Sequence, residues 1–164
     1  MDSTGTGSSA DIVIRLAKVL EIVLYDLELT MNQFRLLSLV GEGVTSAREL
    51  GLRLVVKAPN LTVLTRTMTE RGLLDRTRSE DDGRRIVLTL TPAGGAALAR
   101  ARRHCETALL NVATNVNSPT DAEGLVTSLD RWLPPLDEAA VRLREVAVAE
   151  QPYTRMARSV PTTL

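Results

Sequence analysis

Two adjacent arginines, Arg84 and Arg85, follow an acidic turn with the sequence SEDDG at residues 79–83. β-prone runs flank this turn, so we expect a hairpin that presents both guanidinium groups at its tip. An arginine there has no partner in its own chain, and its planar fork suits phosphate oxygens or the narrow, negative minor groove of DNA. Asp82 could hold the fork of one arginine by a bidentate pair before it binds.

Two short helices are predicted directly before this hairpin. Ser46 and Glu49 have the spacing of a capping box, and Pro59 suits the first turn of a second helix that Gly72 ends. A turn of about four residues joins the two helices, which is the spacing of a helix-turn-helix. A helix-turn-helix followed by an arginine-bearing hairpin is typical of a winged helix, whose second helix enters the major groove and whose hairpin enters the minor groove. Without this context, two arginines on a hairpin would indicate only a solvated surface.

The second of these helices carries polar residues away from its apolar face. We expect five of its side chains to reach DNA: Asn60, Thr62, Val63, Thr65 and Arg66. Asparagine can bond an adenine edge, threonine can bond a base or touch a thymine methyl group, and arginine suits phosphate or guanine.

Further helices are predicted on both sides of the winged helix. The expected helices cover 11–29 with Asp11 as the cap, 31–41 after Thr30, a long segment from Pro92 after Thr91, and 118–133 and 136–150 on either side of a break at Pro134 and Pro135. Residues 1–10 and 151–164 are expected to be loose tails. The first helix has surplus apolar residues (Val13, Ile14 and Ile22), which indicates a partner subunit.

Composition limits the function classes. The chain of 164 residues balances 20 Lys plus Arg against 20 Asp plus Glu, so a basic surface can only be local. One cysteine and one histidine exclude an internal disulfide and argue against a metal site and against an enzyme, and we expect no cofactor. The start of the chain has no secretory signal pattern and no apolar run is long enough to span a bilayer, so we expect a cytoplasmic protein that does not enter membranes.

Cys105 has two interpretations. A cysteine in the middle of a long helix is most simply a buried small hydrophobic residue, because no second cysteine in the chain could resolve an oxidised thiol. A thiol-based redox sensor that pairs across subunits is the alternative. His104 is adjacent, but neighbouring side chains on a helix point about 100° apart, so the two cannot form a nucleophile pair within one chain.

Four stretches, in this order and spacing, resemble the MarR family of bacterial winged-helix transcriptional regulators: LTMNQFRLLSLV, SARELGLRL, NLTVLTRTMTERGLLDR and SEDDGRRIVLTLTPAG. The wing motif DGRR followed by LTLTPAG is the most specific part. The resemblance covers about residues 12–133. It implies a mainly α fold with a small β-hairpin wing. Within a single domain over 11–150, it implies a DNA-binding core at 29–91 and dimerisation helices at 11–28 and 92–150.

The resemblance also implies a function. It implies a homodimeric repressor that binds a pseudo-palindromic operator in double-stranded DNA and is released by an aromatic or lipophilic small molecule, or by thiol oxidation. The family's wing residues fall on Asp82 and Arg84, and its major-groove positions fall on Asn60, Thr62 and Val63. Val63 replaces the polar or basic residue of many relatives, and Lys57 replaces a small capping residue, so the base preference does not carry over. A winged helix that binds another protein instead of DNA is the competing interpretation.

Overall fold

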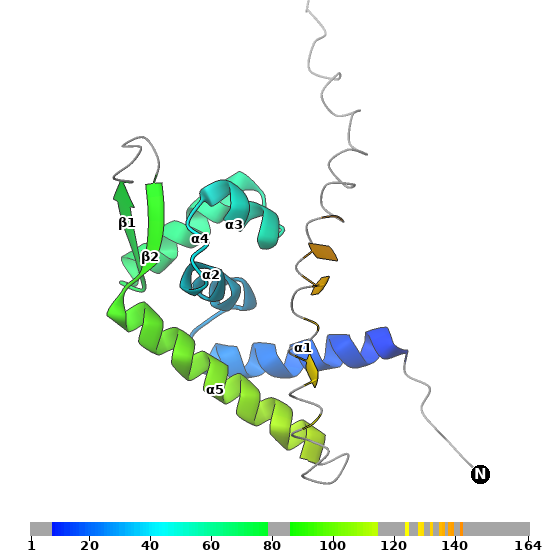
Figure 1. The fold of residues 1–164 in the computed structure, drawn as a ribbon. Coiled ribbons are helices and arrows are strands. Elements are labelled where there is room, and N and C mark those ends of the chain that lie inside the picture. Colours follow the sequence, from blue (N-terminus) through cyan, green and yellow to red (C-terminus); the bar gives the residue numbers. More distant parts are fainter. Residues whose placement is uncertain are drawn as a thin grey trace, which may run out of the picture.

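The computed structural model describes residues 8–78 and 86–114, together with residues 124, 128, 129, 132, 135, 136, 138, 139 and 142. Its elements are α1 (Ser9–Asp26), α2 (Met31–Gly41), α3 (Ala47–Arg53), α4 (Ala58–Glu70), β1 (Leu74–Arg78), β2 (Ile86–Leu90) and α5 (Pro92–Thr114). In Figure 1, α1 and α5 cross at the base of the molecule, α2, α3 and α4 lie above them, and the hairpin rises beside α4. The expected fold class, mainly α with a β-hairpin wing, is confirmed.

Helices α1, α2 and α3 begin at side-chain caps. Thr30 and Gln33 form a reciprocal capping box at the start of α2. At the start of α3 the hydroxyl of Ser46 accepts a hydrogen bond from the backbone N–H of Glu49 at 3.1 Å, as predicted, but the Glu49 carboxylate lies 3.1 Å from Arg53 Nη2 instead of completing the predicted box. For α1 the predicted cap was wrong. Ser8 is the cap, and Asp11 is the third helical residue that bonds back to the backbone N–H of Ser8. The helix therefore begins at Ser9, two residues before its expected start at residue 11.

Helices α1 to α4 all end in the same way. After each of them the chain makes paired backbone bonds back into the last turn, such as Val44 N–H to Leu39 O at 3.0 Å, which is the pattern of a Schellman motif. The residue that turns the chain out of the helix has a positive φ in every case: Glu28 at 56°, Gly43 at 91°, Val55 at 56° and Gly72 at 67°. Glycine adopts this conformation freely, whereas Glu28 and Val55 adopt it under strain.

The core lies between α2 and the elements that surround it. Its fully buried side chains come from five elements and one connection: Leu24, Leu36, Leu37, Leu50, Leu54, Met68 and Leu74. This shared core fixes α3 and α4 relative to α2, and so it fixes the direction in which the exposed face of α4 points.

The hairpin and α5 are joined closely. β1 and β2 are antiparallel, and their register runs from Leu74 opposite Leu90 to Arg78 opposite Ile86. At the base, the Thr91 hydroxyl donates to Gly72 O at 2.7 Å and accepts from the N–H of Gly94 at 2.9 Å, which begins α5 as the sequence predicts. Most of the predicted helices at 118–133 and 136–150, Pro134 of the predicted break, and the tails at 1–7 and 151–164 lie outside the described residues.

Candidate nucleic-acid interface

Helix α4 packs against the core through an apolar face and also contacts α3. Leu61 and Met68 are buried on this apolar face. Arg35 of α2 donates from Nη2 to the carbonyl oxygen of Arg53 at 2.8 Å and thereby ties the end of α3 to α2. The turn of Leu54 to Lys57 separates α3 from α4, which confirms the predicted helix-turn-helix spacing.

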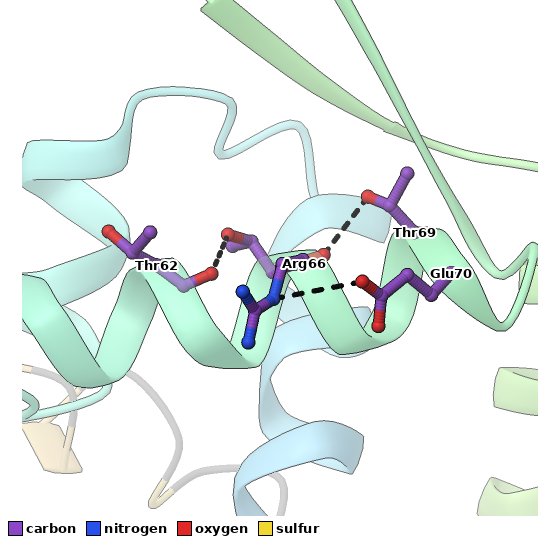
Figure 2. A network of polar contacts seen from close by, with 5 residues as sticks. Thr62, Arg66, Thr69 and Glu70 are labelled. Atoms are coloured by element: carbon purple, nitrogen blue, oxygen red, sulfur yellow. Dashed lines mark hydrogen bonds and ion pairs between the residues drawn. The ribbon is translucent and has the colours of Figure 1, made fainter.

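Four of the five predicted contact residues on α4 share its exposed face. Asn60, Thr62 and Arg66 are exposed, and Val63 is 54% exposed. Figure 2 shows Thr62, Arg66 and Glu70 along the helix, with Arg66 Nε 3.7 Å from a Glu70 carboxylate oxygen. Because both side chains of this pair are about two-thirds exposed, at 65% and 67%, the pair is weak and leaves Arg66 available to another anion.

Thr65 does not belong to this face. Its side chain is buried, with 5% of the residue exposed, and its hydroxyl donates to the carbonyl oxygen of Thr62 at 3.2 Å. The prediction that Thr65 contacts DNA was therefore wrong. Thr65 falls between Leu61 and Met68 on the helix, so it shares their buried face. The hydrogen bond within the helix satisfies this buried hydroxyl group.

Arg48 of α3 is a residue that sequence reasoning missed. It lines a hollow of about 410 Å³ between α3 and the start of α4 that Ala58 and Thr62 also line. Lys57 is exposed at the N-cap of α4 and makes no capping bond with its side chain. Two cations therefore lie near the start of α4, Arg48 in the hollow that Thr62 also lines and Lys57 at the N-cap, and the helix N-terminus itself favours phosphate.

The tip of the predicted wing lies outside the described residues. Asp82, Arg84 and Arg85 all fall in the segment 79–85, so their contacts are not placed. The pairing of Arg78 with Ile86 nevertheless brings both ends of this segment together at the distal end of the hairpin. The sequence therefore puts the three residues in the connection between β1 and β2.

Two hollows lie beside α1. One, of about 580 Å³, lies between α1 and α5 and is lined by Val23, Asp26, Leu27, Arg103, His104, Thr107, Ala108 and Asn111. The other, of about 590 Å³, lies between α1 and the start of α2 and is lined by Lys18, Glu21, Ile22, Tyr25, Leu29, Thr30, Met31 and Asn32. Both mix apolar and polar side chains.

Cys105 is buried on α5, with 7% of the residue exposed, as the simpler interpretation predicts. Burial raises the pKa of its thiol, and the neighbouring negative charge of Glu106 raises that pKa further. His104 is exposed, and its Nδ1 lies 2.9 Å from the carbonyl oxygen of Arg100. A protonated, buried thiol is a poor nucleophile.

Helix α1 exposes large apolar residues over much of its circumference. They are Ile12, Val13, Ile14, Ile22 and Tyr25, which are 56% to 81% exposed.

Among the described residues, no helix is long and apolar enough to cross a membrane. The described part of the chain also contains no group of three or more His, Cys, Asp or Glu side chains that could hold a metal ion.

Residues 26–85, which contain α2 to β1 and the segment of the wing tip, match the model of the MarR family. Among curated proteins, no sequence matches this chain.

Solved structures match the fold over about three quarters of the chain. The transcriptional repressor CouR bound to a 23-mer DNA duplex has a TM-score of 0.61 and 26% identity, over 76% of this chain and 91% of CouR. CouR from Rhodococcus jostii RHA1 bound to p-coumaroyl-CoA has a TM-score of 0.61 and 16% identity, over 78% and 87%. The apo form of wild-type MarR from E. coli has a TM-score of 0.64 and 18% identity, over 79% of this chain and 98% of that protein.

Proposed function

We propose that this chain is a member of the MarR family, whose model matches residues 26–85, and that it is a transcriptional repressor that binds a pseudo-palindromic operator as a homodimer. The observation that carries the proposal is the exposed face of α4. It presents Asn60, Thr62 and Arg66, a set that can read base edges and phosphate, from a helix whose opposite face is buried in the core. In this proposal Arg84 enters the minor groove, Arg85 contacts phosphate, and Asp82 supports Arg84.

The homodimer is supported by the exposed apolar side chains of α1. Ile14 and Tyr25 are 67% and 81% exposed, and a partner subunit would remove this surface from water. In a twofold dimer the two copies of α4 would enter successive major grooves, about 34 to 36 Å apart. Sedimentation at micromolar concentration should show a dimer, and Ile14→Glu should shift it towards the monomer.

A small lipophilic or aromatic molecule is proposed as the effector. The hollow between α1 and α2 supports this, because Ile22, Tyr25 and Met31 offer apolar surface while Lys18 offers a positive charge for an acidic group. One structure shows a repressor named CouR bound to DNA, and another shows CouR from Rhodococcus jostii RHA1 bound to p-coumaroyl-CoA, so proteins of this fold bind each kind of partner.

Selection of bound fragments from genomic DNA tests the proposal. We expect the recovered sites to be pseudo-palindromic and the affinity to fall steeply as salt increases. Asn60→Ala should weaken binding to the recovered site by about 1 to 3 kcal/mol and relax the preference at one position in each half-site. Repeating the selection with candidate aromatic acids should identify the effector by loss of the bound fraction.

The same experiment separates the competing interpretations. A winged helix that binds only proteins would recover no fragment and show no salt-dependent affinity for DNA. A thiol sensor would recover fragments but lose them on treatment with peroxide, and Cys105→Ala would abolish that loss.

A further inference from the structure

Arg71 joins the last turn of α4 to a distant part of the chain. It is the C-cap residue of α4, and its Nη1 donates to the carbonyl oxygen of Glu28 at 2.8 Å and lies 3.4 Å from Oε1 of Gln33. These acceptors are 43 and 38 residues away in sequence, in the connection between α1 and α2 and in the first turn of α2. The contact therefore links α4 to the region in which α1 meets α2.

Both acceptors are held in place by the helix ends to which they belong. Glu28 is the residue of positive φ that ends α1, and the flanking Leu24 and Leu29 are buried on either side of that turn. Gln33 is fixed by its reciprocal bonds with Thr30, since its Oε1 also accepts from the Thr30 N–H at 2.9 Å. Arg71 thus meets two preorganised oxygens rather than two mobile side chains.

We propose that Arg71 is a positioning residue that holds α4 at the angle required for operator binding. This inference rests on the proposed function of the exposed face of α4. Helix α4 has 13 residues and is roughly 20 Å long at 1.5 Å per residue. A tilt of about 3° at its C-terminal end therefore moves the residues near its start by about 1 Å, which exceeds the tolerance of roughly 0.5 Å for a preorganised contact.

The same contact lies next to the proposed effector site. Leu29 and Thr30 line the hollow between α1 and α2, and they directly follow Glu28, whose carbonyl oxygen Arg71 binds. A ligand that displaces this connection would move the acceptor of Arg71. Occupancy of the hollow would then be coupled to the angle of α4 through one side chain.

The test compares Arg71→Ala and Arg71→Lys with the wild-type protein in the full chain. Affinity is measured for the selected operator and for a random duplex, each over a range of salt concentrations. We expect Arg71→Ala to weaken operator binding about tenfold or more with an unchanged salt slope, because the residue makes no phosphate contact. The loss for the random duplex should be much smaller. Arg71→Lys keeps the charge but not the guanidinium fork, and it should lie between the two.

Arg100→Ala is the matched control, because it removes one exposed arginine from α5, away from the contact of Arg71 with Glu28. Equal operator affinity for Arg71→Ala and the wild-type protein would overturn the inference. So would a reduced salt slope, since it would show a direct phosphate contact. If Arg71→Ala fails to fold, the test uses Arg71→Lys and the ratio of its affinity for the operator to its affinity for the random duplex. A ratio equal to that of the wild-type protein overturns the inference. Absence of salt-dependent binding by the wild-type protein would overturn the proposed function as well.

Discussion

Gly94 of α5 lies against the carbonyl group of Leu73, so closely that a Cβ on residue 94 would lie 2.9 Å from the carbonyl carbon. The carbonyl belongs to the backbone just before β1 and also accepts the N–H of Thr91 at 3.2 Å. Glycine at this position lets the first turn of α5 approach the base of the hairpin. The orientation of the wing relative to α5 depends on this approach.

Gly94→Ala should therefore destabilise the protein by about 1 to 3 kcal/mol, because the backbone must shift to accommodate the methyl group. Thermal unfolding measures the change. Gly95→Ala is the control. A Cβ on residue 95 meets nothing within 4 Å, so alanine there should raise stability by up to about 1 kcal/mol through helix propensity. Equal melting temperatures for the two variants would contradict the close approach.

Val55 is strained in the turn between α3 and α4, where its φ is 56°. A β-branched residue in the left-handed region is unfavourable by roughly 1 to 2 kcal/mol, and Val55 is 49% exposed, so little burial is lost on its removal. Val55→Gly should raise the free energy of unfolding by about 0.5 to 1 kcal/mol, as measured by urea denaturation. Gly43→Ala, at the equivalent place after α2, should lower it. If Val55→Gly instead lowers the free energy of unfolding, the valine side chain stabilises the folded protein by more than its backbone strain destabilises it.

Substitutions at Arg84 and Asp82 in the predicted wing distinguish two electrostatic models of DNA binding. Arg84→Ala should weaken operator binding by about 1 to 3 kcal/mol while leaving the melting temperature nearly unchanged. Asp82→Ala should also weaken binding, because Arg84 loses the carboxylate that holds its fork. A simple basic-patch model expects the opposite sign for Asp82→Ala, since that change removes a negative charge near a polyanion. Titration of both variants at two salt concentrations measures the sign, and tighter binding by Asp82→Ala would rule out the support role.

Cys105 should respond to pH in a defined direction. Its thiol pKa is raised in the folded state by burial and by Glu106. The folded state therefore holds the proton more tightly than the unfolded chain, whose thiol titrates near roughly 8.5. The stability that this provides is present below the unfolded pKa and is lost as pH rises through the folded pKa.

Denaturation at a series of pH values from about 7 to 10 should show that loss in the wild-type protein and not in Cys105→Ala. Alkylation of the native thiol at about pH 8 should be slow compared with that of the urea-unfolded chain. Rapid alkylation of the native protein would instead support the thiol-sensor interpretation.

Local signals in the sequence determined most of the helix boundaries. Thr30, Ser46 and Thr91 begin helices and Gly43 and Gly72 end them because the bonds involved span no more than five residues, so the residue types alone specify them. The cap of α1 was misassigned because Ser8 and Asp11 are both good capping residues, and the two reciprocal bonds make them parts of one box.

Only the tertiary structure decided which side chains those helices bury and which distant groups they meet. Thr65 is polar by type but buried, because the core lies against the side of α4 that also carries Leu61 and Met68. The contacts of Arg71 with Glu28 and of Gly94 with Leu73 join residues from different elements. Their geometry depends on how the helices pack around α2, and packing is a property of the whole core that no local pattern of residues encodes.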